Sequence, residues 1–116
     1  MSYDIYLIDK DTGEELKSKE PHNIRGGSYA EGDVTLYLNI TFNYHDAYKK
    51  HGLWLPELDQ RLVKDVISKL FSVYNQLEGE PSVNYWEATD GNAKKALGDL
   101  IKLCSLAPEA KIKVYD

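Results

Sequence analysis

The stretch Val34-Thr-Leu-Tyr-Leu-Asn-Ile-Thr-Phe-Asn-Tyr44 shows the clearest periodicity in the chain. Every second residue is apolar or aromatic, and the residues between them are threonine, tyrosine or asparagine. A period of two places successive side chains on opposite faces of a strand, so one face is buried and the other meets water. We therefore expect a half-buried strand over residues 34–44, with Tyr44 at the end of its apolar face.

Three more segments are predicted as strands of the same sheet. Residues 3–8 are apolar on both alternating faces, which suits a strand inside a sheet rather than at its edge. Asp9-Lys-Asp-Thr-Gly13 is typical of a turn, and residues 14–17 follow it as a short returning strand. Residues 111–115 alternate again and are expected to close the sheet. The glycine-rich stretch after Pro21 is predicted as a loop, with a short strand around Tyr29 as an alternative.

Two main helices are predicted from apolar residues at spacings of three and four. The first covers residues 57–77, with Pro56 at its start, and the second covers residues 91–106, capped by Thr89 or Asp90. A short polar helix around residue 47 is expected to end at Gly52. The fold class is therefore α+β, a small antiparallel or mixed sheet packed against two main helices, in a single domain over residues 1–116.

Composition restricts the classes of function. The chain has 116 residues, 42% of them hydrophobic and 28% charged, with a formal net charge of −5. A general nucleic-acid binder or a binder of anionic membranes needs clustered lysine and arginine, so neither class is expected. No apolar run approaches the roughly 20 residues that span a bilayer. With a single cysteine and no basic-apolar leader pattern at its start, the chain is not expected to be secreted.

No catalytic or metal-binding motif is predicted. The three histidines lack the spacing of zinc ligands, and Asp9-Lys-Asp-Thr-Gly13 fits a calcium loop poorly because its glycine comes one position too early. Cys104 falls on the apolar stripe of the last predicted helix, where a free cysteine behaves as a small hydrophobe. Glu87 and Asp90 could be paired acids, but carboxylates near a helix start are more simply explained by the helix dipole. We expect no enzyme activity, no metal and no cofactor.

Three stretches carry residues suited to binding a ligand: His22-Asn-Ile-Arg-Gly-Gly-Ser-Tyr29, Asn39-Ile-Thr-Phe-Asn-Tyr44 and Tyr85-Trp-Glu-Ala-Thr-Asp-Gly-Asn92. An arginine offers a cationic fork to phosphate, adjacent glycines let backbone N–H groups approach it, and aromatic rings can stack on a base. The start of the last helix offers free N–H groups to an anion. The predicted ligand-binding residues are Arg25, Gly26, Gly27, Tyr29, Asn39, Asn43, Tyr44, Trp86, Thr89 and Asn92. Each stretch taken singly is equally well explained as ordinary turn, strand and cap chemistry.

The same stretches, together with Tyr3-Asp-Ile-Tyr-Leu-Ile-Asp9 and Thr12-Gly-Glu14, carry a resemblance to a known group of proteins. The chain resembles a family of small, mostly uncharacterised proteins encoded by phages and prophages of Gram-positive and gut bacteria. The likeness covers nearly the whole chain and is weakest over residues 49–80. It implies a protein that is made in the host cytoplasm and acts on host machinery or defence.

Two classes of function are therefore open. In the first, the protein is a non-enzymatic counter-defence factor that binds and sequesters a nucleotide-derived immune signal, and a second copy of the chain can complete the site in a homo-oligomer. In the second, it is an inhibitor of a host defence enzyme, similar to an anti-CRISPR protein, and uses exposed aromatic residues to cover its partner. A phage structural or accessory factor is a third alternative. The first class requires the aromatic residues to surround a pocket, and the second requires them on a flat or convex acidic face.

Overall fold

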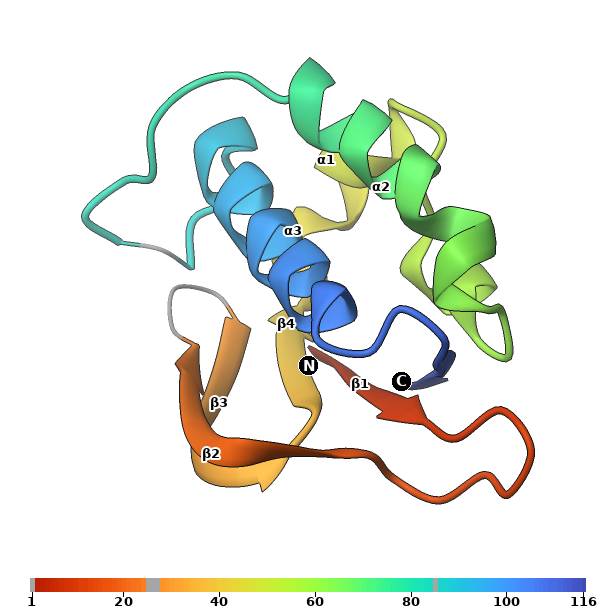
Figure 1. The fold of residues 1–116 in the computed structure, drawn as a ribbon. Coiled ribbons are helices and arrows are strands. Elements are labelled where there is room, and N and C mark those ends of the chain that lie inside the picture. The colour runs from red at the N-terminus through yellow and green to blue at the C-terminus, as the bar shows by residue number, and fades with distance from the viewer. Residues whose placement is uncertain (1, 25–27, 85) are drawn as a thin grey trace.

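The computed structural model of the chain describes residues 2–24, 28–84 and 86–116, and between residues 19 and 33 it describes the backbone alone. The predicted α+β class is confirmed (Figure 1). The strands are β1 (Ser2–Ile8), β2 (Lys17–Ile24), β3 (Ser28–Thr35), β4 (Tyr37–Thr41) and β5 (Lys111–Tyr115). The helices are α1 (His45–Lys49), α2 (Val63–Gln76) and α3 (Asp90–Ser105), with two short 3-10 helices, η1 (Phe42–Tyr44) and η2 (Leu55–Leu58).

The strands form one antiparallel sheet in the order β2-β3-β4-β1-β5. β1 lies between β4 and β5, with Ile5 opposite Leu38 on one side and Val114 on the other. The prediction of an internal strand at residues 3–8 is therefore confirmed, and so is the terminal strand at residues 111–115. Two segments from opposite ends of the sequence are thus neighbours in the sheet.

The strand predicted over residues 34–44 is divided into two strands and a 3-10 turn. Leu36 interrupts it, because its backbone N–H donates to Leu16 and its carbonyl accepts from Leu7 as the chain passes from β3 to β4. At the other end, the hydroxyl of Thr41 accepts a hydrogen bond from the backbone N–H of Asn43 and starts η1. Both breaks come from hydrogen bonds that a period of two does not reveal.

The segment before β3 also differs from the prediction. Residues 14–17 contribute only an isolated bridge, between Glu15 and Ile8, and the strand β2 begins at Lys17. Where a loop was expected after Pro21, β2 and β3 pair as an irregular antiparallel hairpin with two register shifts. Charged residues and a proline conceal this hairpin in the sequence, because strand pairing at a sheet edge tolerates them.

The first predicted helix starts later than expected, whereas the second matches closely. Residues 59–62 do not enter α2, because they lie along β5 instead. The backbone N–H of Gln60 donates to Ile112 O at 2.7 Å, and the N–H of Ile112 donates to Arg61 O at 2.8 Å. Gln60 adopts a positive φ of 67° to make this pairing. The segment covers the outer edge of β5, so this side of the sheet has no free row of backbone groups.

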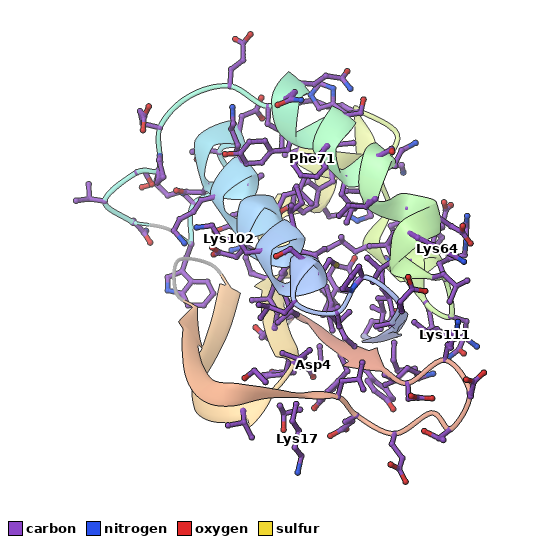
Figure 2. All side chains as sticks on the ribbon, viewed as in Figure 1. Asp4, Lys17, Lys64, Phe71, Lys102 and Lys111 are labelled. Carbon is purple, nitrogen blue, oxygen red and sulfur yellow. The ribbon has the colours of Figure 1, made fainter. Side chains whose placement is uncertain are left out.

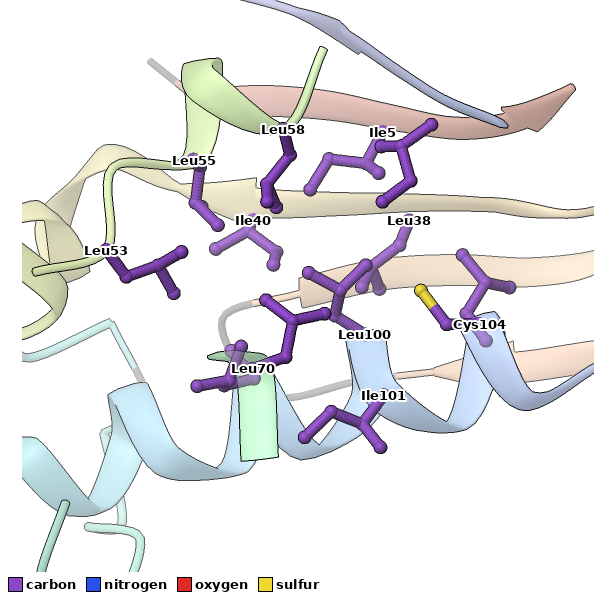
Figure 3. Packing of buried hydrophobic residues seen from close by; sticks show 14 of the residues in the cluster. Ile5, Leu38, Ile40, Leu53, Leu55, Leu58, Leu70, Leu100, Ile101 and Cys104 are labelled. Atoms are coloured by element: carbon purple, nitrogen blue, oxygen red, sulfur yellow. The ribbon is translucent and has the colours of Figure 1, made fainter. Parts of the chain in front are cut away.

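The helices pack on one face of the sheet and enclose the core (Figure 3). Leu53, Leu55 and Leu58 extend this core from the α1–α2 connection, and Cys104 lies fully buried in the core on α3, as the sequence predicted. The Tyr48 hydroxyl donates to Ala93 O at 2.8 Å and ties α1 to α3.

Charged side chains such as Lys64 and Lys102 lie on the outer faces of α2 and α3 (Figure 2). Among the described residues, no helix is long and apolar enough to cross a bilayer.

The opposite face of the sheet carries three tyrosines, Tyr6, Tyr37 and Tyr115, which we call the tyrosine face. The Tyr6 ring lies 4.9 Å from the Tyr37 ring and 5.8 Å from the Tyr115 ring, measured between centroids. The Tyr37 hydroxyl donates to Asp4 Oδ1 at 2.6 Å. Burial raises the pKa of Tyr37, and the Asp4 carboxylate adds to the effect. These contacts hold the three rings in a fixed arrangement.

Candidate functional site

Trp54 is held outward by the local sequence Leu53-Trp-Leu55. α1 ends where Gly52 takes a φ of +81°, which an L residue rarely adopts, and the extended backbone that follows alternates its side chains. Leu53 and Leu55 are buried, so the ring between them must face solvent, and Trp54 is 47% exposed. A half-exposed tryptophan fixed between two core anchors can stack on a planar ring without reordering of the chain.

A cavity of about 360 Å³ opens beside this ring. It is lined by His45, Lys49, Gly52, Leu53, Trp54 and Glu57, which come from α1, η2 and the connection between them. Its volume falls within the range of small-molecule sites, which are mostly apolar with a few convergent polar groups. One aromatic ring, one ammonium, one imidazole and one carboxylate face the same small space.

The buried residue Tyr3 on β1 contacts two side chains that line this cavity, His45 and Trp54. Its hydroxyl lies 3.4 Å from His45 Nδ1 and accepts a hydrogen bond from the Trp54 side chain. Because the indole N–H can only donate, the Tyr3 oxygen is the acceptor in its contact with Trp54. Burial raises the pKa of Tyr3, and the charge of Asp116 adds to this shift, so the hydroxyl keeps its proton at neutral pH. The imidazole and the indole are therefore oriented by one buried group.

A second cavity, of about 220 Å³, adjoins the first. It shares four lining residues with the first cavity, namely Gly52, Leu53, Trp54 and Glu57, and continues toward α2 along Leu58, Arg61, Asp65, Val66 and Lys69. We call the two adjoining cavities the Trp54 groove. Its cations, Lys49, Arg61 and Lys69, form no salt bridge with another described residue. The groove therefore combines a stacking ring with ammonium and guanidinium groups that are available to an anion.

Neither a metal-binding cluster nor a reactive thiol is found among the described residues. They contain no cluster of three histidine, cysteine, aspartate or glutamate side chains placed to hold a metal ion. Burial raises the pKa of the Cys104 thiol to about 12, so it carries almost no thiolate at neutral pH. The groove can stack a ring, attract an anion and accept hydrogen bonds at Glu57.

Comparisons with protein-family models, with curated proteins and with solved structures find no match to this chain.

The predicted ligand-binding residues lie elsewhere, and two of them are corrected by the structure. Tyr44 is fully buried in the core, where its ring packs edge-on against Tyr48, so it cannot stack on a ligand. Asn92 is also fully buried. Its Oδ1 accepts from the Ser82 backbone N–H at 2.9 Å, and its Nδ2 donates to Ser82 Oγ, Asn84 O and Glu87 O. Its side chain organises the loop before α3, and because it is fully buried it is not exposed to a ligand.

The start of α3 is not an open anion site either. Thr89 caps the helix by accepting a hydrogen bond from the backbone N–H of Asn92 at 3.1 Å. The carbonyl of Glu80 lies so close to Gly91 that a Cβ there would come within 2.1 Å of its oxygen. The chain's own loop thus covers the end of the helix. The predicted anion site at this end is wrong for that reason.

Other predicted residues meet in pairs without forming one pocket. Asn43 Nδ2 donates to the Trp86 backbone oxygen at 2.8 Å, which joins the second and third stretches. Tyr29 pairs with Asn39 through the backbones of β3 and β4. The Asn39 side chain donates to Ser2 Oγ and Asp4 Oδ1, beside the tyrosine face. Arg25, Gly26 and Gly27 lie outside the described residues.

The sequence reasoning therefore missed the Trp54 groove. The sequence did contain a local sign of the exposed ring. Trp54 stands between two leucines in an extended segment, so it must point outward when both leucines are buried. The cavity itself depends on where α1 and α2 lie, and that is set by tertiary packing. Predicting a helix from residue 57 also placed Arg61 on a regular helix rather than on the segment that pairs with β5.

Proposed function

We propose that this protein is a non-enzymatic binding protein that holds a small nucleotide-derived ligand in the Trp54 groove. The single observation that carries the proposal is a half-exposed Trp54 ring in a cavity of about 360 Å³, beside Lys49 and His45. A base stacks on the indole, and a phosphate lies against the cations. No bond in the ligand needs to break, so tight binding alone removes the signal.

The biological setting of the proposal comes from the resemblance to phage and prophage proteins. A phage product in the host cytoplasm that binds a nucleotide-derived immune signal would lower its free concentration below the level that activates a defence effector. Sequestration needs a high affinity and a sufficient amount of protein, and both can be measured on the purified chain.

The test is a thermal-shift screen against cyclic dinucleotides, cyclic oligonucleotides and ADP-ribose derivatives, because a ligand that binds only the folded state raises the melting temperature. The matched variants are Trp54→Ala and Trp86→Ala, since the two rings are equally exposed, at 47% and 49%, and lie at different sites. We expect a dose-dependent shift that Trp54→Ala abolishes and Trp86→Ala retains.

Two outcomes would count against the proposal. A shift lost in Trp86→Ala and kept in Trp54→Ala would move the site to the residues predicted from the sequence around Trp86. No shift with any of these ligands would remove the small-molecule function altogether.

A second candidate function, inhibition of a protein partner, is favoured by the tyrosine face. Tyrosines are common at the centres of protein interfaces, and Tyr115 is 52% exposed beside Tyr6 and Tyr37. If a host protein binds here, a Tyr6→Ala and Tyr115→Ala double variant loses it in a pull-down from host lysate while Trp54→Ala keeps it.

A further inference from the structure

We infer that the Trp54 groove takes a ligand with two separate anionic groups, one on either side of a stacked base, which is the chemistry of a dinucleotide. This inference rests on the proposed function and specifies its ligand class. It comes from the division of the groove into two cavities that share the wall Gly52, Leu53, Trp54 and Glu57 and have different cations beyond it.

The first anionic subsite is on the α1 side, at Lys49. The neighbouring Lys50 is already committed, because its Nζ lies 2.8 and 2.9 Å from the two carboxylate oxygens of Asp90. Lys49 has no such partner among the described residues and lines the cavity together with His45. Of two consecutive lysines, one is a structural tie between α1 and α3, and the other is available to a phosphate.

The second anionic subsite is on the α2 side, at Arg61 and Lys69. The Lys69 ammonium lies beside Gly52 in the shared wall. A Cβ built on Gly52 would be only 3.3 Å from the Lys69 Nζ. Since Gly52 has no side chain, the wall is low at this point and a ligand can cross it. Arg61 adds a planar donor fork that suits phosphate.

The carboxylate between the two subsites favours a nucleoside over a simple aromatic acid. Glu57 lines both cavities and accepts hydrogen bonds only, so it suits the exocyclic amine of a base or the hydroxyl of a ribose. Asp65 lies at the α2 end, where it lowers the net positive charge beside Arg61 and Lys69. Along the groove, a cation at Lys49 is followed by the Trp54 ring with the Glu57 acceptor, and then by a second pair of cations. This order matches a ligand in which a nucleoside lies between two phosphates.

The test measures the dissociation constants of cyclic di-AMP, cyclic di-GMP and the corresponding mononucleotides by isothermal titration calorimetry. The variants are Lys69→Ala and Lys49→Ala, with Lys64→Ala as the control, because Lys64 lies on α2 outside the groove and is exposed. For at least one cyclic dinucleotide, we expect Lys69→Ala to weaken binding about tenfold or more and to leave its mononucleotide unchanged. Lys49→Ala should weaken both ligands, and Lys64→Ala neither.

The possible failures separate the two proposals. If Lys69→Ala has no more effect than Lys64→Ala, or a mononucleotide binds as tightly as its dinucleotide, the second subsite is wrong. The proposed function then stands, provided that binding still depends on Trp54. If no cyclic dinucleotide binds while an ADP-ribose derivative gives a Trp54-dependent shift, the dinucleotide inference alone is overturned. If nothing in the panel binds, both proposals fail.

Discussion

The side-chain oxygen of Asn92 accepts a hydrogen bond of 2.9 Å from the backbone N–H of Ser82, which lies ten residues earlier in the chain. The same amide reaches forward along the loop and donates to Glu87 O at 3.0 Å. One buried side chain on α3 thereby fixes the start and the end of the loop that carries Trp86. Asn43 adds a tie from outside the loop, because its Nδ2 donates to the Trp86 carbonyl, while Val83 is fully exposed at the outer turn.

Asn92→Ala should lower the free energy of unfolding by about 2 kcal/mol, because it leaves the partly buried Ser82 backbone N–H without its partner and removes the hydrogen bonds from the Asn92 amide to the Asn84 and Glu87 carbonyls. Urea denaturation measures the change, as a lower midpoint with an unchanged slope. The same substitution at the exposed Asn75 on α2 is the control and should cost less than about 1 kcal/mol. Equal effects at both positions would show that the Asn92 contacts do not stabilise the fold.

Gly91→Ala should destabilise the protein much more than Gly98→Ala does, although both glycines lie in α3. A methyl group at position 91 would lie 2.1 Å from the backbone carbonyl oxygen of Glu80. A backbone carbonyl cannot move away as easily as the end of a flexible side chain can. At position 98 the nearest atom is the Tyr74 ring, at 3.0 Å, which can rotate, and alanine is the better helix former. We expect a loss of about 2 kcal/mol or more for Gly91→Ala.

The measurement for this pair is again urea denaturation, with circular dichroism to confirm that both variants keep their helix content. A larger loss at Gly98 than at Gly91 would mean that the loop does not lie against the start of α3 as described.

Cys104 should react with a thiol reagent only when the protein unfolds. Burial raises the pKa of its thiol to about 12, and its side chain is fully enclosed by the core. At pH 8, Ellman's reagent should therefore modify native protein far more slowly than protein in denaturing urea, and the rate should follow the unfolded fraction. Rapid, complete modification of the native protein would contradict the placement of Cys104 in the core.

Alkaline pH should weaken the fold through Tyr37, whose pKa in the folded protein is raised by burial and by Asp4. A raised pKa means that the folded state holds the proton more tightly, so this contribution is complete below about pH 10 and is lost as the pH rises above it. Melting temperatures of Tyr37→Phe should fall less steeply than wild type over this range. Asp4→Asn should show a smaller change in the same direction, because burial alone then raises the pKa. An unchanged slope in Tyr37→Phe would exclude Tyr37 as a source of the decline.

Local patterns in the sequence were enough to predict β1 and α3, and nonlocal pairing explains most of the rest. β1 is apolar on both faces and α3 begins at a threonine cap, and each signal lies within the element itself. The delayed start of α2 depends on Gln60 and Arg61 pairing with β5, some fifty residues later in the chain. No local propensity near residue 60 could show that.

The candidate site was less predictable than the fold. The alternation over residues 34–44 already placed Tyr44 on the apolar face, so its burial followed from the pattern and conflicted with a stacking role. Asn92 and Thr89 have residue types that suit ligands and helix caps equally well, and only the hydrogen bonds separate the two roles. The exposure of Trp54 could have been deduced, but the cavity beside it is formed between α1, η2 and the connection that joins them.

The pairing of residues 60–62 with β5 has a consequence for self-assembly. Protein sheets with a bare edge strand recruit further copies and grow into fibrils or strand-swapped dimers. Here the outer edge of β5 is already occupied by Gln60 and Arg61 of the same chain. Polymer growth by strand addition is therefore blocked on this side of the molecule, and a regular oligomer that forms in concentrated solution has to be built through another surface.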